Sequence, residues 1–333
     1  MAPLNRPGAR VLRRLLRHAW RFEADSDMEA RIEHGLAVIE TDDVAVLPRG
    51  GRGYPASLEH LHDPPALLFA RGRRELLERP LLGLVGTRRC TRDGREFTHE
   101  IAGAVVAAGG VVMSGLALGI DGVAHQASLP ETVAVLGCGI DVYQPPSHRA
   151  LQDDIAREGL LLTEYPPGSE ALPFHFPQRN RLIAALARAV LVVEAPARSG
   201  ALITAEHATD IGVQVLAVPG PPRRPASVGT NALLRDGAAL VMEPRDVLDA
   251  LGLAPRRARM GSVPADRAGG GPAEPPGLRG EALALWRAAE TPGHVDELAE
   301  RAGLAASASL GALLELEVLG LVRRAPGQRY QRA

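Results

Sequence analysis

The chain has 333 residues, 46% hydrophobic and 23% charged, which is ordinary for a globular protein with room for two or three domains. Its formal net charge is −1, and all 38 basic side chains other than histidine are arginine. This balance excludes a protein that coats nucleic acid through bulk positive charge, so any DNA binding must depend on a local basic site. Two cysteines, Cys90 and Cys138, provide no disulfide framework and no zinc spacing, which is consistent with a reducing cytoplasm.

The N-terminal region, residues 1–50, is expected to be short and mainly helical. Residues 1–22 hold six arginines but lack serine and a small-residue cleavage signature, so they predict a basic surface helix rather than a transit peptide. We expect helices over 11–22 and 28–37, followed by a strand over 44–47.

Residues 51–252 alternate short apolar runs with helix-length spacers. Such runs, rich in valine and leucine, are typical of strands buried on both faces, and the spacers predict crossover helices. The core is therefore expected to be an α/β, doubly wound, mostly parallel sheet of extended Rossmann-like type. The expected strands cover 81–85, 111–113, 133–136, 160–162, 190–193, 213–218 and 238–241.

An uncharged stretch, residues 101–120, superficially resembles a membrane span. It contains five glycines, and Gly109-Gly110 divides it into a helix end and a strand start. No membrane segment is predicted.

Residues 253–278 lose all periodicity and are rich in proline, glycine, alanine and arginine, which predicts a flexible linker. Residues 279–333 then show three helical patterns, 281–289, 295–302 and 309–319, followed by a small hairpin that turns at 326–327. This order predicts a winged-helix-like domain. Its third helix is acidic and apolar and contains no arginine, which favours protein interaction or regulation over DNA reading.

Glycine-containing turns follow four of the expected strands. In an open parallel sheet these turns meet at one edge, where exposed backbone N–H groups and helix starts bind anions. One such turn is usually only geometric, but four that converge, with serine and threonine hydroxyls, predict a phosphate site. The turns contain Gly86-Thr87-Arg88, Ser114-Gly115, Gly137-Cys138-Gly139 and Ser199-Gly200.

The densest group of binding side chains lies in residues 173–181, Pro-Phe-His-Phe-Pro-Gln-Arg-Asn-Arg. Aromatic faces stack on bases while arginines hold phosphates. Phe176, beside the arginines, is expected to stack a base, whereas Phe174 fits a core position and a binding position equally well.

Catalytic patterns are absent: the sequence has no G-x-S-x-G elbow, Walker A lysine or H-E-x-x-H. Asp121, His125 and Cys138 could suggest a metal, but a helix cap for Asp121 and a packing role for His125 fit better. Glu164 and Glu194, at strand ends, are expected to orient loop backbones and arginines. We predict no catalytic residue, no metal and no cofactor.

Eight motifs in order across about 54–251 resemble the DNA-processing protein A (DprA/Smf) family. They begin with Val-Gly-Thr-Arg at 85–88 and Ser-Gly-Leu-Ala-Leu-Gly-Ile-Asp at 114–121, and include His-Phe-Pro-Gln-Arg-Asn-Arg-Leu-Ile at 175–183 and Gly-Thr-Asn-Ala-Leu-Leu-Arg-Asp-Gly-Ala at 229–238. The resemblance implies a Rossmann-like protein that binds and protects single-stranded DNA without a nucleotide and forms homodimers through its core. It also implies transfer of incoming strands to the RecA recombinase in natural transformation.

The same resemblance implies roles for individual residues. Gly86, Thr87 and Arg88 would hold phosphate and Phe176 would stack a base. The pocket lining would include Arg179, Asn180 and Arg181, with Ser199, Gly200, Thr230 and Asn231 nearby.

Two departures from the family pattern stand out. Leu118 occupies a position that is usually basic, so a phosphate contact is missing there unless Arg92 or Arg198 replaces it, and the N-terminal helical region is abbreviated.

Two other functions stay open. A phosphoribohydrolase-like nucleotide-processing enzyme would share the core, but residues 219–222 and 228–231 lack that family's Gly-Gly pair and catalytic glutamate. An interaction scaffold would instead work through its winged helix.

Overall fold

The computed structural model describes residues 9–19, 28–253, 278–290, 293–319, 321–325 and 329–332. The chain divides into two compact units, Met1–Arg259 and Met260–Ala333, each with its own hydrophobic core. Apart from its end residues 253 and 278, the predicted linker lies outside the described residues.

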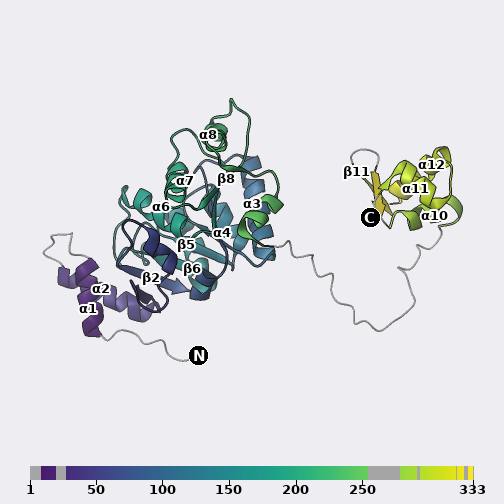
Figure 1. Ribbon diagram of the computed structural model, residues 1–333. Helices are drawn as coiled ribbons and strands as arrows, with labels where there is room; N and C mark the ends of the chain where they lie inside the picture. Colours follow the sequence, from purple (N-terminus) through teal and green to yellow (C-terminus); the bar gives the residue numbers. More distant parts are fainter. Residues whose placement is uncertain are drawn as a thin grey trace. The chain divides into compact units, whose positions relative to one another are not determined.

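The first unit is built on a single sheet, within the described residues, of nine strands in the order β1-β2-β6-β5-β4-β3-β7-β8-β9 (Figure 1). Strands β3 to β9 are parallel, and β2 pairs antiparallel with both β1 and β6. The chain builds outward from β3 in one direction through β4, β5 and β6, and in the other through β7, β8 and β9. The predicted doubly wound, mostly parallel sheet is confirmed. The strands are β1 Ala45–Pro48, β2 Leu67–Gly72, β3 Leu81–Val85, β4 Val111–Ser114, β5 Thr132–Val135, β6 Leu160–Thr163, β7 Ala189–Val192, β8 Gln214–Ala217 and β9 Ala239–Leu240.

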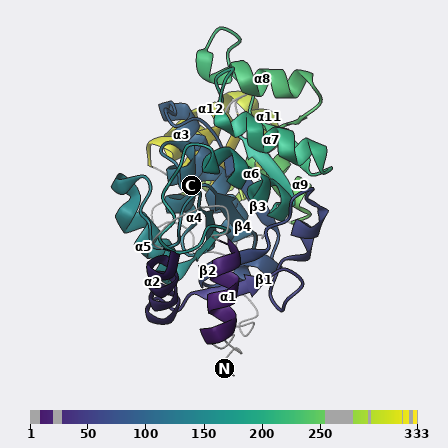
Figure 2. The same cartoon turned by 90° about the vertical axis from the view of Figure 1, so that its left-hand side faces the viewer.

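Helices cover both faces of this sheet because the central strands bury side chains on both sides. In β3, Leu81 and Val85 belong to one core with the inner sides of α6 and α7, whereas Leu82 and Leu84 belong to another with α3, α4 and α9. A third core joins α1, α2 and α5 to the sheet near β2, and both ribbon views show α1 and α2 side by side (Figures 1 and 2). These helices are α1 Ala9–Ala19, α2 Met28–Thr41, α3 Arg92–Ala107, α4 Ile120–Ser128, α5 Arg149–Glu158, α6 His175–Leu186, α7 Gly200–Asp210, α8 Val228–Arg235 and α9 Pro244–Leu251.

Strand β2 was not among the predicted strands. Its four buried residues are followed by half-buried Arg71, whose guanidinium pairs with Asp42 at 3.0 Å, and by Gly72 at φ +107°. Because β2 lies between β1 and β6, it joins β1 to the main sheet. The strand expected at 44–47 is therefore part of the core sheet rather than of a separate N-terminal region.

The second unit has the predicted winged-helix order. It contains α10 Gly280–Ala288, β10 Gly293–His294, α11 Val295–Ala302, α12 Ala306–Val318, β11 Val322–Ala325 and β12 Arg329–Arg332, with strand order β10-β12-β11. Leu285, Leu298, Leu313 and Leu316 are fully buried between the helices. On α12 the exposed side chains include Leu314 and Glu315. The predicted turn at 326–327 lies outside the described residues.

The uncharged stretch 101–120 runs from α3 through β4 to the start of α4, and Gly109, at φ +89°, lies between α3 and β4. In the described parts of the chain, no helix is both long and apolar enough to cross a membrane.

Candidate nucleic-acid interface

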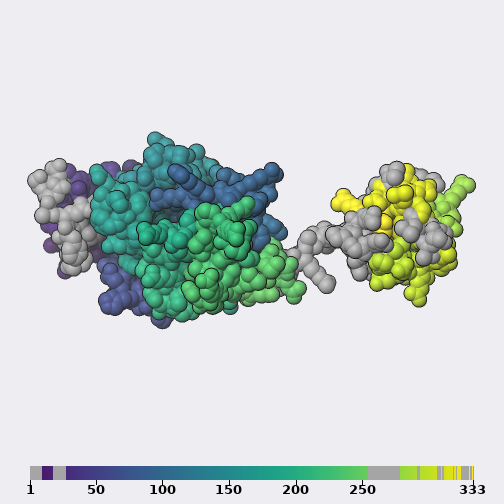
Figure 3. Space-filling model, turned by 90° about the horizontal axis from the view of Figure 1, so that it is seen from above, coloured from purple at the N-terminus to yellow at the C-terminus, as the bar shows by residue number. Residues whose placement is uncertain are grey.

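A cleft of about 970 Å³ opens at the carboxyl ends of β3 and β7. These strands are hydrogen-bonded neighbours, but the chain leaves them toward opposite halves of the sheet, so the loops that follow them diverge. This reversal of strand order is where open α/β sheets bind ligands. Figure 3 shows this face of the unit from above, with the blue segment after β3 and the green segments near α7 around a hollow.

One wall of the cleft is basic. Arg88 and Arg89 follow β3, Arg198 precedes α7, and Arg224 lies in the loop between β8 and α8; all four are exposed and line the cleft. The Arg224 guanidinium pairs with Asp93 at 3.2 Å. In the described part of the chain, no ion pair engages the other three. Their charges are therefore available to an anionic ligand.

A second part of the lining is apolar and comes from the start of α6, where Pro173, Phe176 and Pro177 line the cleft. The Phe176 ring is half-buried and lies over Gly137, after β5, so closely that a Cβ at Gly137 would be 3.0 Å from its Cδ1. Glycine at this position leaves room for the Phe176 ring, which also lines the cleft.

Arg179 lines the cleft floor and is only 4% exposed. Its Nη1 donates to the carbonyl oxygen of Gly115 at 2.9 Å and to that of Val135, and its Nε donates to Asn180 at 3.2 Å. Burial lowers the pKa of Arg179, and the nearby carboxylate of Asp121 opposes this effect. Arg179 was predicted to line the DNA-binding pocket; it does line the cleft, but these donors are directed to the backbone at the ends of β4 and β5.

Asp121 accepts hydrogen bonds from the backbone N–H of Gly115 at 3.1 Å and of Ala117 at 3.4 Å. It therefore fastens the loop before α4; it does not cap the helix as expected, because the N-cap residue is Gly119. Burial raises the pKa of Asp121, while the charge of Arg179 and these two hydrogen bonds lower it.

The turn after β3 is held from two sides. The Thr87 N–H donates to the carbonyl oxygen of Glu194 at 2.7 Å, and the Arg89 N–H donates to Thr87 Oγ1 at 3.2 Å. A Cβ at Gly86 would lie 2.6 Å from the Ile120 side chain, so this glycine is required for close packing on α4. The turn thus presents Arg88 and Arg89 to the cleft from a fixed backbone.

The two strand-end glutamates orient loops and arginines, as predicted, and they do so separately. Glu194 accepts from the Thr91 N–H at 2.8 Å and from its hydroxyl at 2.6 Å, which fixes the start of α3. Glu164 forms a two-bond ion pair with Arg181, at 2.7 and 2.8 Å. Burial raises the pKa of Glu164, and Arg181 lowers it.

At the start of α7, Ser199 accepts a hydrogen bond from the Ala201 N–H at 3.3 Å as the N-cap residue. Gly200 is exposed, with no atom within 4 Å of the position a Cβ would take. Asn180 Nδ2 donates to the Gly200 carbonyl oxygen at 3.1 Å and so links α6 to α7. This open helix start is suited to an anion.

The structure brings eight of the thirteen predicted binding residues to the cleft lining: Gly86, Thr87, Arg88, Phe176, Arg179, Asn180, Ser199 and Gly200. The other five lie outside this lining. Ser114 is fully buried and donates to the Leu84 carbonyl oxygen at 2.7 Å, and Gly115 lies against the Arg179 guanidinium. Arg181 is paired with Glu164. Thr230 donates to the Ser227 carbonyl oxygen at 3.2 Å, and Asn231 donates to and accepts from the backbone of Gly220.

Arg89, Arg198 and Arg224 line the cleft but were not among the predicted binding residues. Of the two suggested replacements for a basic residue at position 118, Arg198 lines the cleft and Arg92 pairs with Glu96 at 2.7 Å. Leu118 itself is 44% exposed.

His125 has the packing role that was favoured over metal binding. Its Nε2 accepts from the Leu116 N–H at 3.3 Å, and its Nδ1 bonds the Thr132 hydroxyl at 2.8 Å. Burial lowers the pKa of His125 to about 3. Over the residues that the structure describes, no three histidine, cysteine or acidic side chains gather as metal ligands.

The chain belongs to the DNA recombination-mediator protein A family. The model of that family matches residues 45–252, and a second model, the DprA winged helix domain, matches residues 271–328. The chain is 38% identical to Protein Smf of Synechocystis over 84% of its own length and 78% of that protein. It is 43% identical to DNA processing protein DprA of Streptococcus pneumoniae over 59% of this chain and 70% of that one.

Two solved structures of the family are similar in fold. DprA of S. pneumoniae superposes with a TM-score of 0.61 and 39% identity, over 68% of this chain and 78% of that one. DprA of Helicobacter pylori superposes with a TM-score of 0.58 and 30% identity, over 63% of this chain and 96% of that one; that H. pylori protein binds single-stranded DNA.

Proposed function

We propose that this protein binds single-stranded DNA in the cleft between the β3 and β7 loops. The observation that carries this proposal is that basic side chains and an aromatic ring line one cleft. Exposed Arg88, Arg89 and Arg198, without acidic partners in the described residues, line the same cleft as the half-buried ring of Phe176. Arginines bind backbone phosphates and an aromatic face stacks a base, which is the division of labour in single-strand sites. The relative from H. pylori, studied for single-stranded DNA binding, supports the proposal.

The geometry favours single strands over duplex. In a duplex both faces of each internal base are covered by neighbouring bases, so none can reach Phe176 without unstacking. A single strand exposes its bases at little cost, and its flexible backbone can follow the basic wall. The near-neutral chain limits the contact to a few phosphates.

Binding rather than catalysis is proposed for the cleft. In the lining, as far as the chain is described, Asp121 is the single acidic residue, and it is occupied by the backbone N–H groups of Gly115 and Ala117. The strand-end Glu194 is likewise occupied, because its carboxylate accepts hydrogen bonds from the N–H and the hydroxyl of Thr91. No cofactor is required by this account.

By family likeness, we further propose that the protein is cytoplasmic, protects incoming or exposed strands and delivers them to the RecA recombinase in natural transformation and recombination. We also propose a homodimer formed through the core. Support for the dimer comes from the sheet edge, where Leu240 of β9 is 49% exposed and the adjacent Met242 69% exposed, a combination that favours burial against a second copy. Dimerisation would add avidity to a small site.

The direct test is a titration of labelled single-stranded and duplex oligonucleotides of one sequence, followed by fluorescence anisotropy. We expect clear preference for the single strand. The core alone, residues 1–252, should retain most of that affinity. A scaffold that acts through its winged helix would instead lose binding when residues 253–333 are removed. Equal affinity for both DNA forms would contradict the proposal.

A further inference from the structure

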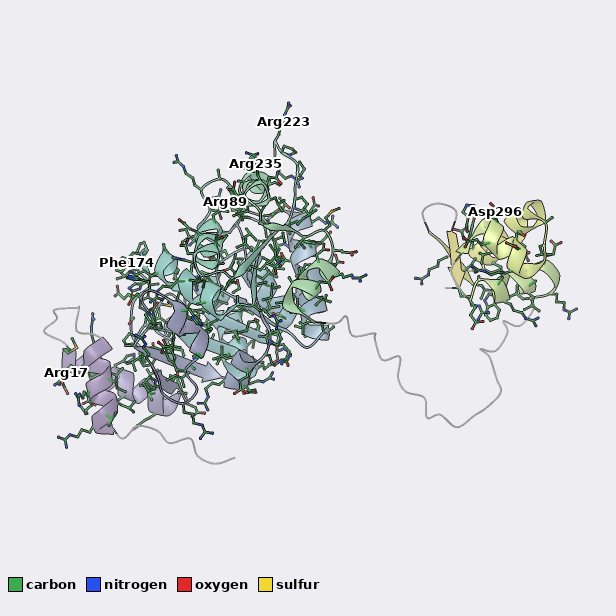
Figure 4. All side chains as sticks on the ribbon, in the orientation of Figure 1. Arg17, Arg89, Phe174, Arg223, Arg235 and Asp296 are labelled. Carbon is green, nitrogen blue, oxygen red and sulfur yellow. The ribbon has the colours of Figure 1, made fainter. Side chains whose placement is uncertain are left out.

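Phe174 is an exposed aromatic residue beside the cleft. It is 57% exposed, although the neighbouring Phe176 is half-buried in the cleft wall and Phe69 is fully buried in the core. Phe174 directly follows Pro173, a lining residue, and directly precedes α6 (Figure 4). The sequence left open whether this side chain plugs the core, and its exposure excludes that role.

The ring of Phe174 packs against one buried aromatic neighbour. The buried ring of His175 meets it edge to face, with 4.7 Å between centroids and 76° between planes. His175 is in turn stacked on Tyr165, at 4.0 Å and 28°. The Tyr165 hydroxyl is within hydrogen-bonding distance of two acceptors, the His175 carbonyl oxygen at 3.3 Å and Gln178 Oε1 at 3.2 Å, which ties this stack to the first turn of α6.

An aromatic ring that is fixed on one side and open to solvent on the other is suited to stacking a flat ligand, because little side-chain entropy is lost on binding. Pro173, Phe176 and Pro177 line the cleft, and exposed Phe174 is the next residue after Pro173, just outside that lining. A strand that leaves the cleft past Pro173 would therefore bring a base to Phe174.

We propose that Phe174 is a second base-stacking position, outside the cleft, for single-stranded DNA whose phosphates and first stacked base occupy the cleft. This inference rests on the proposed function and extends it. It predicts that the protein gains affinity as an oligonucleotide grows past the cleft. The gain should tolerate any base, because every base offers a π-face.

The test compares Phe174→Ala, Phe174→Leu and Phe174→Trp in the full chain, each with an oligothymidylate of three nucleotides and one of twelve. We expect Phe174→Ala to weaken binding of the twelve-nucleotide strand about fivefold, the lower end for one stacked base, and to leave the trinucleotide unchanged. Phe174→Leu should weaken it similarly, because it keeps an apolar side chain but removes the π-face. Phe174→Trp should retain affinity and gain a fluorescence change on binding beyond that of the wild-type chain.

A twelve-nucleotide strand without bases provides the control for stacking. Phe174→Ala should bind this abasic strand as the wild-type chain does. If Phe174→Ala or Phe174→Leu binds the twelve-nucleotide oligothymidylate with wild-type affinity, this inference is overturned and the proposed function still stands. A wild-type chain that binds neither oligothymidylate overturns the proposed function itself.

Discussion

The guanidinium of Arg179 donates to the carbonyl oxygen of Gly115 at 2.9 Å, which joins α6 to the end of β4 beneath the cleft. The same group reaches Val135 at the end of β5, while Asp121 holds the Gly115 N–H from the other side. The cleft floor thus rests on a buried arginine whose charge is balanced within the protein. The basic residues that can meet DNA are a different set, at the rim.

Arg179→Met is expected to destabilise the fold. It leaves two buried carbonyl groups without a donor and Asp121 without its countercharge, so the free energy of unfolding should fall by about 3–5 kcal/mol. Denaturant unfolding followed by circular dichroism measures this change. Arg198→Met, at the exposed rim, is the matched control and should change stability by no more than about 0.5 kcal/mol while it weakens DNA binding. Equal stability of the two variants would refute the floor role of Arg179.

Arg181→Met separates an ion-pair role from a DNA-binding role. The pair with Glu164 is largely sheltered, with side chains 14% and 16% exposed, so its loss should cost about 1–3 kcal/mol of stability. The dependence of DNA binding on salt should not change, because Arg181 lies outside the cleft lining. Adding Glu164→Gln should restore part of the stability, since the unpaired carboxylate is then removed. A reduced salt slope in Arg181→Met would instead support the DNA-binding role first expected for Arg181.

His125 should make the protein sensitive to acid. Burial lowers its pKa to about 3, whereas the unfolded chain has the ordinary value of about 6.5, so below pH 6.5 the unfolded state binds more protons. The stability from neutral His125 is complete above that pH and is lost as the pH falls toward 3, by about 1.4 kcal/mol per unit. His125→Gln should remove this part of the pH dependence in unfolding experiments between pH 4 and 6. His99→Gln, at an exposed position of α3, should leave it intact.

Gly86→Ala should destabilise the turn after β3 by about 1–3 kcal/mol, because the new Cβ would lie 2.6 Å from Ile120. Gly103→Ala, within α3 and with no atom within 4 Å of the new Cβ, should instead stabilise by about 0.5–1 kcal/mol. Melting temperatures of the two variants measure the difference. If both substitutions are tolerated equally, the turn is not packed on α4 as described.

The sheet was predictable because its central strands are recognisable from their own residues, without knowledge of their pairing partners. Runs such as 81–85 and 190–193 are apolar at every position, which only a strand buried on both faces requires, and the glycine turns after them mark the edge where the cleft lies. Strand β2 gave a weaker signal, since Arg71 and Gly72 end it and its place depends on pairing with the distant β6.

Within α6, helical spacing separates residues that line the cleft from residues that do not, although residue type alone does not separate them. Phe176, Asn180 and Ile183 lie three or four residues apart and share the face that lines the cleft, whereas Arg181, five residues after Phe176, points elsewhere. This periodicity could have separated Arg181 from the site. Nothing local distinguishes buried Arg179 from rim arginines, because its partners Gly115 and Val135 are 64 and 44 residues away in sequence. The position of Arg224 depends likewise on how the loop after β8 folds back over the sheet edge.

The central claim is that a few rim arginines hold phosphates while Phe176 stacks a base, and the salt dependence of single-stranded DNA affinity tests it most directly. For the wild-type chain, the slope of log affinity against log salt should be about −2 to −4. Arg88→Ala should weaken binding and reduce the magnitude of that slope by about 0.7 to 1, the contribution of one phosphate. Phe176→Ala should weaken binding about 5- to 100-fold without changing the slope. Unchanged affinity in both variants would show that DNA, if bound, lies elsewhere on the molecule.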